Sequence, residues 1–214
     1  IHGVEALTGL LRATGDDAVR SRLSETLVAL EDSVAAHRGR LFTTYDADGR
    51  PADRDVSYGH DIQTVFLGLD ARAALGWSPT TPLEALVEPV VRRGTDRRTG
   101  ALVYGRRHRR PWRQRHRLEW VQMEAINTFA VLAALRDAER DHYLRLLSHT
   151  WHYVERALID HEHGGLLVGR DGRGRVIDPR KSHRWFACYH SVRAMLNAAD
   201  RLAELATTRA SVAD

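Results

Sequence analysis

Residues 57–62 read SYGHDI, a stretch that supplies a serine cap to a helical pattern and places His60 in its first turn. Side chains able to carry proton or sugar chemistry recur at similar distances: His2 lies 58 residues before His60, Glu124 lies 64 after it, and His190 follows after another 66. A mostly helical repeat of about 60 residues is two helices and a loop, and such units stack into solenoids or toroids. The spacing predicts that these four side chains converge on one cavity.

A second marker has the same period. Gly39, Gly100 and Gly165 each follow a helical pattern, at intervals of 61 and 65 residues. The segments after the first and last of these glycines are LFTTYDADGRP at 41–51 and LLVGRDGRGRV at 166–176. Both alternate polar and apolar residues around Asp-Gly turn signals, which predicts short β-hairpins between the helix pairs.

Composition limits the class of protein. The 214 residues are 43% hydrophobic, which predicts a globular protein with a substantial core. Cys188 is the single cysteine, so an internal disulfide is excluded and a reducing compartment is expected. We find no apolar run near 18 residues and no export signal, so the sequence predicts a cytoplasmic protein without a membrane partner.

The positive charge has two features. The net charge is +4, and Lys181 is the only lysine among 32 basic residues, a bias typical of a GC-rich genome. The basic residues are densest in the segment Arg106–Arg117, which also contains Trp112. We interpret this segment as a solvated loop; the alternatives are a lid that meets an anionic substrate and, third, a nucleic-acid surface. No nucleic-acid partner is predicted.

Apolar residues at three- and four-residue steps predict seven helices. The expected ranges are 4–11, 23–34, 62–75, 83–91, 120–135, 143–158 and 185–205. Asp16 or Asp17 is expected to cap the second helix, Ser57 the third and Thr81 the fourth, with Pro82 in the first turn of the fourth. Strands are expected only in the hairpins.

The candidate chemistry lies on the odd-numbered helices. This alternation predicts an all-α fold of the double-layered α/α toroid type, in which inner helices line the cavity and outer helices surround them. Residues 1–214 are expected to form a single domain, and seven helices do not close the ring. Because the chain starts with Ile1-His2 inside a helical pattern, we expect a C-terminal part of a longer barrel. Preceding residues or a partner chain, such as a homodimer mate, would supply the rest.

Four short motifs resemble the N-acylglucosamine 2-epimerase superfamily, which includes cellobiose 2-epimerases and mannose isomerases. They are IHGVEA at 1–6, SYGHDI at 57–62, WVQMEA at 120–125, and Trp185 followed by Tyr189-His190 and Arg193-Ala194. The family fold is an (α/α)6 barrel of about twice this length, so the resemblance covers only its C-terminal half.

The resemblance implies a sugar 2-epimerase or an aldose–ketose isomerase. Its substrate would be a free reducing sugar of the mannose or glucose type, an N-acylglucosamine or a β-1,4-disaccharide. His60 and His190 would be the acid/base pair that moves a proton through a cis-enediolate, work for which the ordinary pKa of histidine is suited. No metal and no cofactor are predicted.

Five further residues would bind the substrate: His2, Trp120, Glu124, Trp185 and Gln63. His2 would contact sugar hydroxyls or assist ring opening, unless it is frayed at the terminus. The two tryptophans would pack on sugar rings, or else belong to the core. Glu124 would bind hydroxyls, steady a histidine, or pair with an arginine. Gln63 stands where the family has a glutamate, so it would orient His60 without charge and leave a weaker base.

Other departures from the family pattern leave two alternatives open. Glu119 precedes Trp120 where the family has a second tryptophan, and the family's oxyanion arginine belongs to the absent half. The chain could therefore be a catalytically impaired sugar-binding or assembly module. A glycoside hydrolase ranks a distant third, because it needs two opposed carboxylates and only Glu124 and Asp61 are candidates. Arg193 is expected to be structural, and Cys188 a small packed residue.

Overall fold

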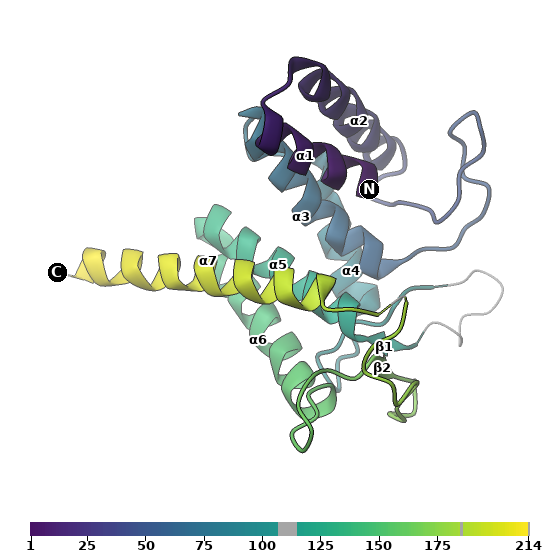
Figure 1. The fold of residues 1–214 in the computed structure, drawn as a ribbon, viewed down its shortest axis with the longest axis vertical. Coiled ribbons are helices and arrows are strands. Elements are labelled where there is room, and N and C mark those ends of the chain that lie inside the picture. Colours follow the sequence, from purple (N-terminus) through teal and green to yellow (C-terminus); the bar gives the residue numbers. More distant parts are fainter. Residues whose placement is uncertain (107–114, 185, 214) are drawn as a thin grey trace.

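A computed structural model describes residues 1–106, 115–184 and 186–213 (Figure 1). Seven α-helices lie in these ranges, as predicted. They are α1 His2–Thr14, α2 Asp17–Ala36, α3 Tyr58–Leu75, α4 Val87–Gly94, α5 Glu119–Leu135, α6 Arg140–Ala157 and α7 Tyr189–Ala213. Short 3-10 turns at Pro82–Leu86 and Asp137–Glu139 precede α4 and α6, and strands β1 (Arg117–Leu118) and β2 (Gly169–Arg170) pair antiparallel.

The helices form two layers. The odd-numbered helices pack in sequence, α1 against α3, α3 against α5 and α5 against α7. The even-numbered helices lie outside this row, with α2 against α1 and α3, α4 against α3, and α6 against α5 (Figure 1). This is the predicted incomplete (α/α) barrel, in which the candidate chemistry lies on the inner helices. None of the helices in the described residues is long and apolar enough to cross a bilayer.

The predicted helix caps are present. Asp16 accepts hydrogen bonds from the backbone N–H groups of Ala18 (2.7 Å) and Val19 (3.1 Å), so it caps α2 in preference to Asp17. Ser57 accepts from His60 N–H at the start of α3, and Thr81 caps the turn that leads into α4. Each cap satisfies backbone donors that the first turn leaves without a partner.

The start of the last helix is a correction. The apolar pattern predicts a helix from residue 185, but α7 begins at Tyr189. The backbones of His183 and Phe186 exchange hydrogen bonds of 3.0 and 2.8 Å, which folds this segment into a turn before the helix. Trp185 itself, like residues 107–114 of the basic segment, lies outside the described residues.

The periodic glycines mark the turns between helix pairs. Gly39, Gly100 and Gly165 have φ of 71°, 77° and 77°, in the left-handed region that favours glycine. A Cβ on Gly39 would also lie 2.7 Å from the carbonyl oxygen of Ala85, and one on Gly100 would lie 2.8 Å from that of His149. The backbone conformation therefore favours glycine at all three positions, and at Gly39 and Gly100 there is also no room for a side chain.

Both predicted hairpins form. Isolated bridges join Tyr45 to Pro51 and Arg170 to Val176. The pairing of β1 with β2 is additional, because it connects the segment before α5 with the loop after α6. This long-range pairing has no local sequence signal.

Helix α5 is the centre of the molecule. Fourteen of its 17 residues are buried, so polar side chains on it face other helices and not water. Gln122 is fully satisfied, because its side chain exchanges two 2.8 Å hydrogen bonds with the backbone of Leu102 and donates a third to Leu118. Glu124 on the same helix has no exposed surface and takes part in the candidate site.

Candidate active site

The structure brings four predicted residues together on the inner helices. The imidazole of His60 lies 5.0 Å from the indole of Trp120, measured between ring centroids, and Trp120 lies 5.3 Å from the imidazole of His190. His2 on α1 lies 6.5 Å from His60 on its other side. The indole therefore lies next to two histidines, one from α3 and one from α7.

His60 is held by the cap of its own helix. Its Nδ1 lies 2.7 Å from the Ser57 hydroxyl, which also accepts the backbone N–H of His60. Burial, followed by the neighbouring His2 and His190, lowers the pKa of His60 to about 4. His60 is consequently neutral at pH 7 and able to accept a proton.

His190 is held by a buried carboxylate. Its Nδ1 lies 2.5 Å from Oε1 of Glu124, a residue with no exposed surface. Arg193, one turn further along α7, donates to the same oxygen, and Gln63 Nε2 approaches it at 3.4 Å. Binding of Nδ1 fixes the ring and leaves Nε2 as the nitrogen free to act on a ligand.

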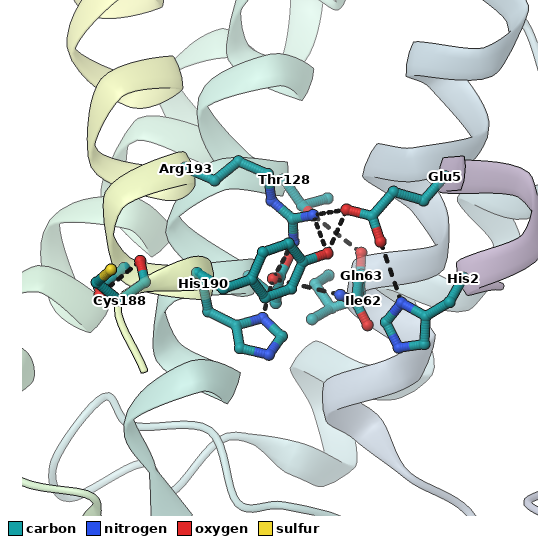
Figure 2. A network of polar contacts seen from close by, with 11 residues as sticks. His2, Glu5, Ile62, Gln63, Thr128, Cys188, His190 and Arg193 are labelled. Carbon is teal, nitrogen blue, oxygen red and sulfur yellow. Dashed lines mark hydrogen bonds and ion pairs between the residues drawn. The ribbon is translucent and has the colours of Figure 1, made fainter. Parts of the chain in front are cut away.

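A chain of side chains links α7 to α1 (Figure 2). Glu5 accepts hydrogen bonds from the hydroxyl of Tyr189 and from Arg193, while its other oxygen lies 3.1 Å from Nδ1 of His2. Burial opposes the ionisation of Glu5, but the hydrogen bonds from Tyr189 and His2 and the charge of Arg193 outweigh it and lower its pKa. Arg193 thus bridges two carboxylates and joins the ends of the inner row.

Trp120 is positioned by a glycine. A Cβ on Gly59 would lie 2.5 Å from the indole, so only glycine allows the ring to pack over the start of α3. Tyr104 adds a second aromatic side chain, 5.9 Å from Trp120 and 6.5 Å from His60. These rings form an apolar wall beside the imidazoles, the kind of surface on which a sugar ring packs.

The two remaining predicted binding residues, Gln63 and Glu124, have no exposed surface. Their side chains contact each other and not open space. Of the roles considered for Glu124, this placement favours steadying a histidine and pairing with an arginine. The partner of the His60 ring is Ser57, whereas Gln63 turns toward Glu124.

Residues that the sequence did not assign to the site are Glu5 and Tyr189, which complete the network, and Tyr104. Glu5 and Tyr189 stand inside the motifs, but their pairing spans 184 residues and has no local signal. Among the described residues, no group of three or more His, Cys, Asp or Glu side chains is close enough to hold a metal ion.

A buried acid also lies beside this network. Glu119 has no exposed surface, and the hydroxyl of Ser191 is a polar neighbour of its carboxyl group. Burial, followed by the negative charge of Glu124, raises the pKa of Glu119 to about 8. It is therefore a neutral acid at pH 7, so Glu124 is the carboxylate that balances His190 and Arg193.

Comparisons with known proteins identify relatives of the chain. Residues 59–194 match the family model of N-acylglucosamine 2-epimerase (GlcNAc 2-epimerase). The chain is 23% identical over 210 residues to cellobiose 2-epimerase of Dictyoglomus turgidum, a match that covers 94% of this chain and 52% of that protein. The chain thus spans about half the length of the curated relative it matches.

Solved structures share the fold. Cellobiose 2-epimerase from Spirochaeta thermophila superposes with a TM-score of 0.84 and 25% identity, over 94% of this chain and 51% of that one. A D-mannose isomerase gives a TM-score of 0.79 at 19% identity, over 92% of this chain and 54% of that one. The family model covers well over half of the 214 residues. The chain therefore belongs to the N-acylglucosamine 2-epimerase family.

Proposed function

We propose that the whole protein is a sugar 2-epimerase or an aldose–ketose isomerase that acts on a free reducing sugar. The observation that carries the proposal is that His60 and His190, from two different inner helices, both lie next to Trp120. Epimerisation needs two proton carriers on opposite faces of a planar intermediate, and two inner helices supply them. The substrate classes are the mannose or glucose type, an N-acylglucosamine or a β-1,4-disaccharide.

In the proposed mechanism the neutral imidazole of His60 removes the C2 proton of the open-chain aldose. The electron pair forms the cis-enediolate, with the negative charge on the former carbonyl oxygen. His190 then gives its proton to the opposite face of C2, which restores the C1 carbonyl and yields the epimer. For the ketose the proton goes to C1, while the hydroxyl proton on O2 moves to O1 and the carbonyl forms at C2. Glu124 balances the charge on His190 while it holds that proton.

The binding roles follow from position. Trp120 would pack on the sugar ring, and the family resemblance suggests Trp185, which lies outside the described residues, as a second indole. His2 would contact a hydroxyl or assist ring opening, because it stands next to His60. Glu124 and Gln63 would act through His190. We further infer that residues 1–214 are the C-terminal part of a longer cytoplasmic barrel, or that a partner chain completes the wall.

A second candidate is a sugar-binding module without turnover. It is favoured by the partner of His60, which is a hydroxyl and not a carboxylate, so nothing strengthens this imidazole as a base. Both candidates bind a sugar beside Trp120. They differ only in whether a proton leaves C2.

Proton exchange at C2 decides between them. We expect the protein in D2O to incorporate deuterium at C2 of mannose, glucose or cellobiose. NMR measures the incorporation and identifies the product as the epimer or the ketose. Sugar binding without any exchange would establish the non-catalytic module. Release of a new reducing end from a glycoside would instead favour the hydrolase.

The pH below which kcat/KM declines depends on the pKa of His60. Its pKa of about 4 predicts that kcat/KM stays level as the pH falls through 6.5, the ordinary histidine value, and declines only toward pH 4. His60 acts as a base and must therefore be unprotonated. Its low pKa keeps the imidazole unprotonated from pH 6.5 down to the region of pH 4, so the rate falls only there. The measurement is the pH profile of interconversion at constant ionic strength. A decline centred on the ordinary histidine pKa would contradict the role of His60.

A further inference from the structure

A second cavity lies on the outer side of α3, away from the Trp120 wall. It is formed by the segment after α2, the start of α3, helix α4 and the strand-like residues before 107, and its volume is about 390 Å³. Four arginines line it: Arg40, Arg54, Arg93 and Arg106. Arg40 and Arg54 belong to the segment between α2 and α3, whereas Arg93 and Arg106 belong to α4 and the segment after it, so the fold brings two stretches of the chain together.

All four arginines are exposed, and their guanidinium groups have no counterion among the described residues. Within residues 1–106, 115–184 and 186–213, no ion pair or side-chain hydrogen bond involves any of the four arginines. Elsewhere the chain pairs its less exposed arginines, as in Arg72 with Glu31 (2.7 Å) and Arg136 with Glu84. The acids that flank Arg54 in the sequence, Asp53 and Asp55, are not part of the cavity lining. Like charges held together repel each other, so an anion in this space would stabilise the arrangement.

The floor of the cavity carries a buried acid. Asp61 is 5% exposed and lines the cavity, yet its carboxyl group has no hydrogen-bond partner among the described residues. Burial raises the pKa of Asp61 to about 8, so at pH 7 it carries a proton that it can donate. Tyr58, 6% exposed, lies beside it. The side chains around the cavity are thus cationic or neutral.

We propose that this cavity binds the phosphate group of a small phosphorylated metabolite. Four convergent guanidinium groups suit a doubly charged tetrahedral oxyanion, which accepts several charge-assisted hydrogen bonds, better than a single carboxylate. The volume lies at the small end of the range for ligand pockets, roughly 300–1,000 Å³, which favours a ligand of sugar-phosphate size. This proposal does not depend on the epimerase reaction.

The cavity shares a wall with the space beside His60. Asp61 and Phe42 also line a neighbouring cavity of about 280 Å³, whose other lining residues include His60 and Ser57. The two cavities therefore have Asp61 and Phe42 in common, and a phosphate bound in the first would lie near His60. It would lie next to the cap that orients His60.

Calorimetric titration at fixed ionic strength tests the proposal, with inorganic phosphate, glucose 6-phosphate and uncharged glucose as probes. We expect saturable binding of the two phosphates and a dissociation constant about 10-fold higher in Arg54→Gln and Arg93→Gln, as expected for loss of one charge-assisted contact. Arg145→Gln, an exposed arginine on α6, is the matched control and should bind as the unsubstituted protein does. Thermal unfolding of each variant checks that it is folded.

The outcomes separate the possible ligands. Tighter binding of glucose 6-phosphate than of inorganic phosphate would identify an organic phosphate ester, whereas equal affinity would identify the free ion. The proposal is overturned if neither phosphate binds, or if Arg145→Gln weakens binding as much as Arg54→Gln and Arg93→Gln. The readout is binding alone, so absence of epimerase activity would leave this result unaffected.

Discussion

Replacing His190 with alanine is expected to lower the rate of sugar interconversion by about 10²- to 10⁴-fold, the range for loss of a positioned proton carrier. His60→Ala should have a similar effect, because each imidazole serves one face of the intermediate. The two rings come from different inner helices, His60 from α3 and His190 from α7, so each is expected to serve its own face. Interconversion should therefore fail in both variants.

The two variants should differ in what they retain. A protein with one remaining base can still remove and return a proton on its own face of C2, so it should exchange deuterium into one epimer without forming the other. His60→Ala and His190→Ala should then label opposite epimers. The measurement is NMR of each purified epimer in D2O.

The matched control is His152→Ala. This histidine is exposed on α6 and bonds only within its helix, to the carbonyl oxygen of Ser148 at 2.6 Å. It should leave both rates unchanged. Equal labelling of both epimers by either single variant would mean that one base serves both faces, and the two-histidine mechanism would be wrong.

Much of this site could be predicted because its signals are local or periodic. Ser57 and Asp16 cap their helices through backbone groups two or three residues away, and the four reactive side chains share one repeat. In contrast, the contacts of Glu5 with Tyr189 and Arg193 span 184 and 188 residues. Only the packed inner row brings those residues together, so spacing cannot predict them.

Gln63 shows the same limit at shorter range. One helical turn separates it from His60, and the sequence therefore suggests that its amide orients that ring. In the structure the amide approaches Glu124 at 3.4 Å, while the serine cap takes the imidazole. Helical spacing predicts which side chains share a face, but a neighbouring helix decides which of them pair.

Arg193→Met is expected to reduce the free energy of unfolding by about 3–5 kcal/mol, the range for removing one partner of a buried ion pair. Glu124 has no exposed surface, so loss of the guanidinium leaves its negative charge buried with only His190 and Gln63 as neighbours. The variant also loses the bridge to Glu5. Methionine keeps much of the side-chain volume, and the measurement is urea denaturation at pH 7.

A second substitution separates lost pairing from lost packing. Glu124→Gln removes the buried charge, so in the double variant Arg193→Met no longer leaves an ion without its partner. We expect the double variant to be more stable than the sum of the two single losses predicts, with a coupling of about 1–3 kcal/mol. Arg201→Met, on the same helix but 40% exposed, is the control and should change stability by less than about 0.5 kcal/mol. If the two losses simply add, Arg193 contributes through packing against Phe66 and Tyr189, and Glu124 is stabilised by His190 alone.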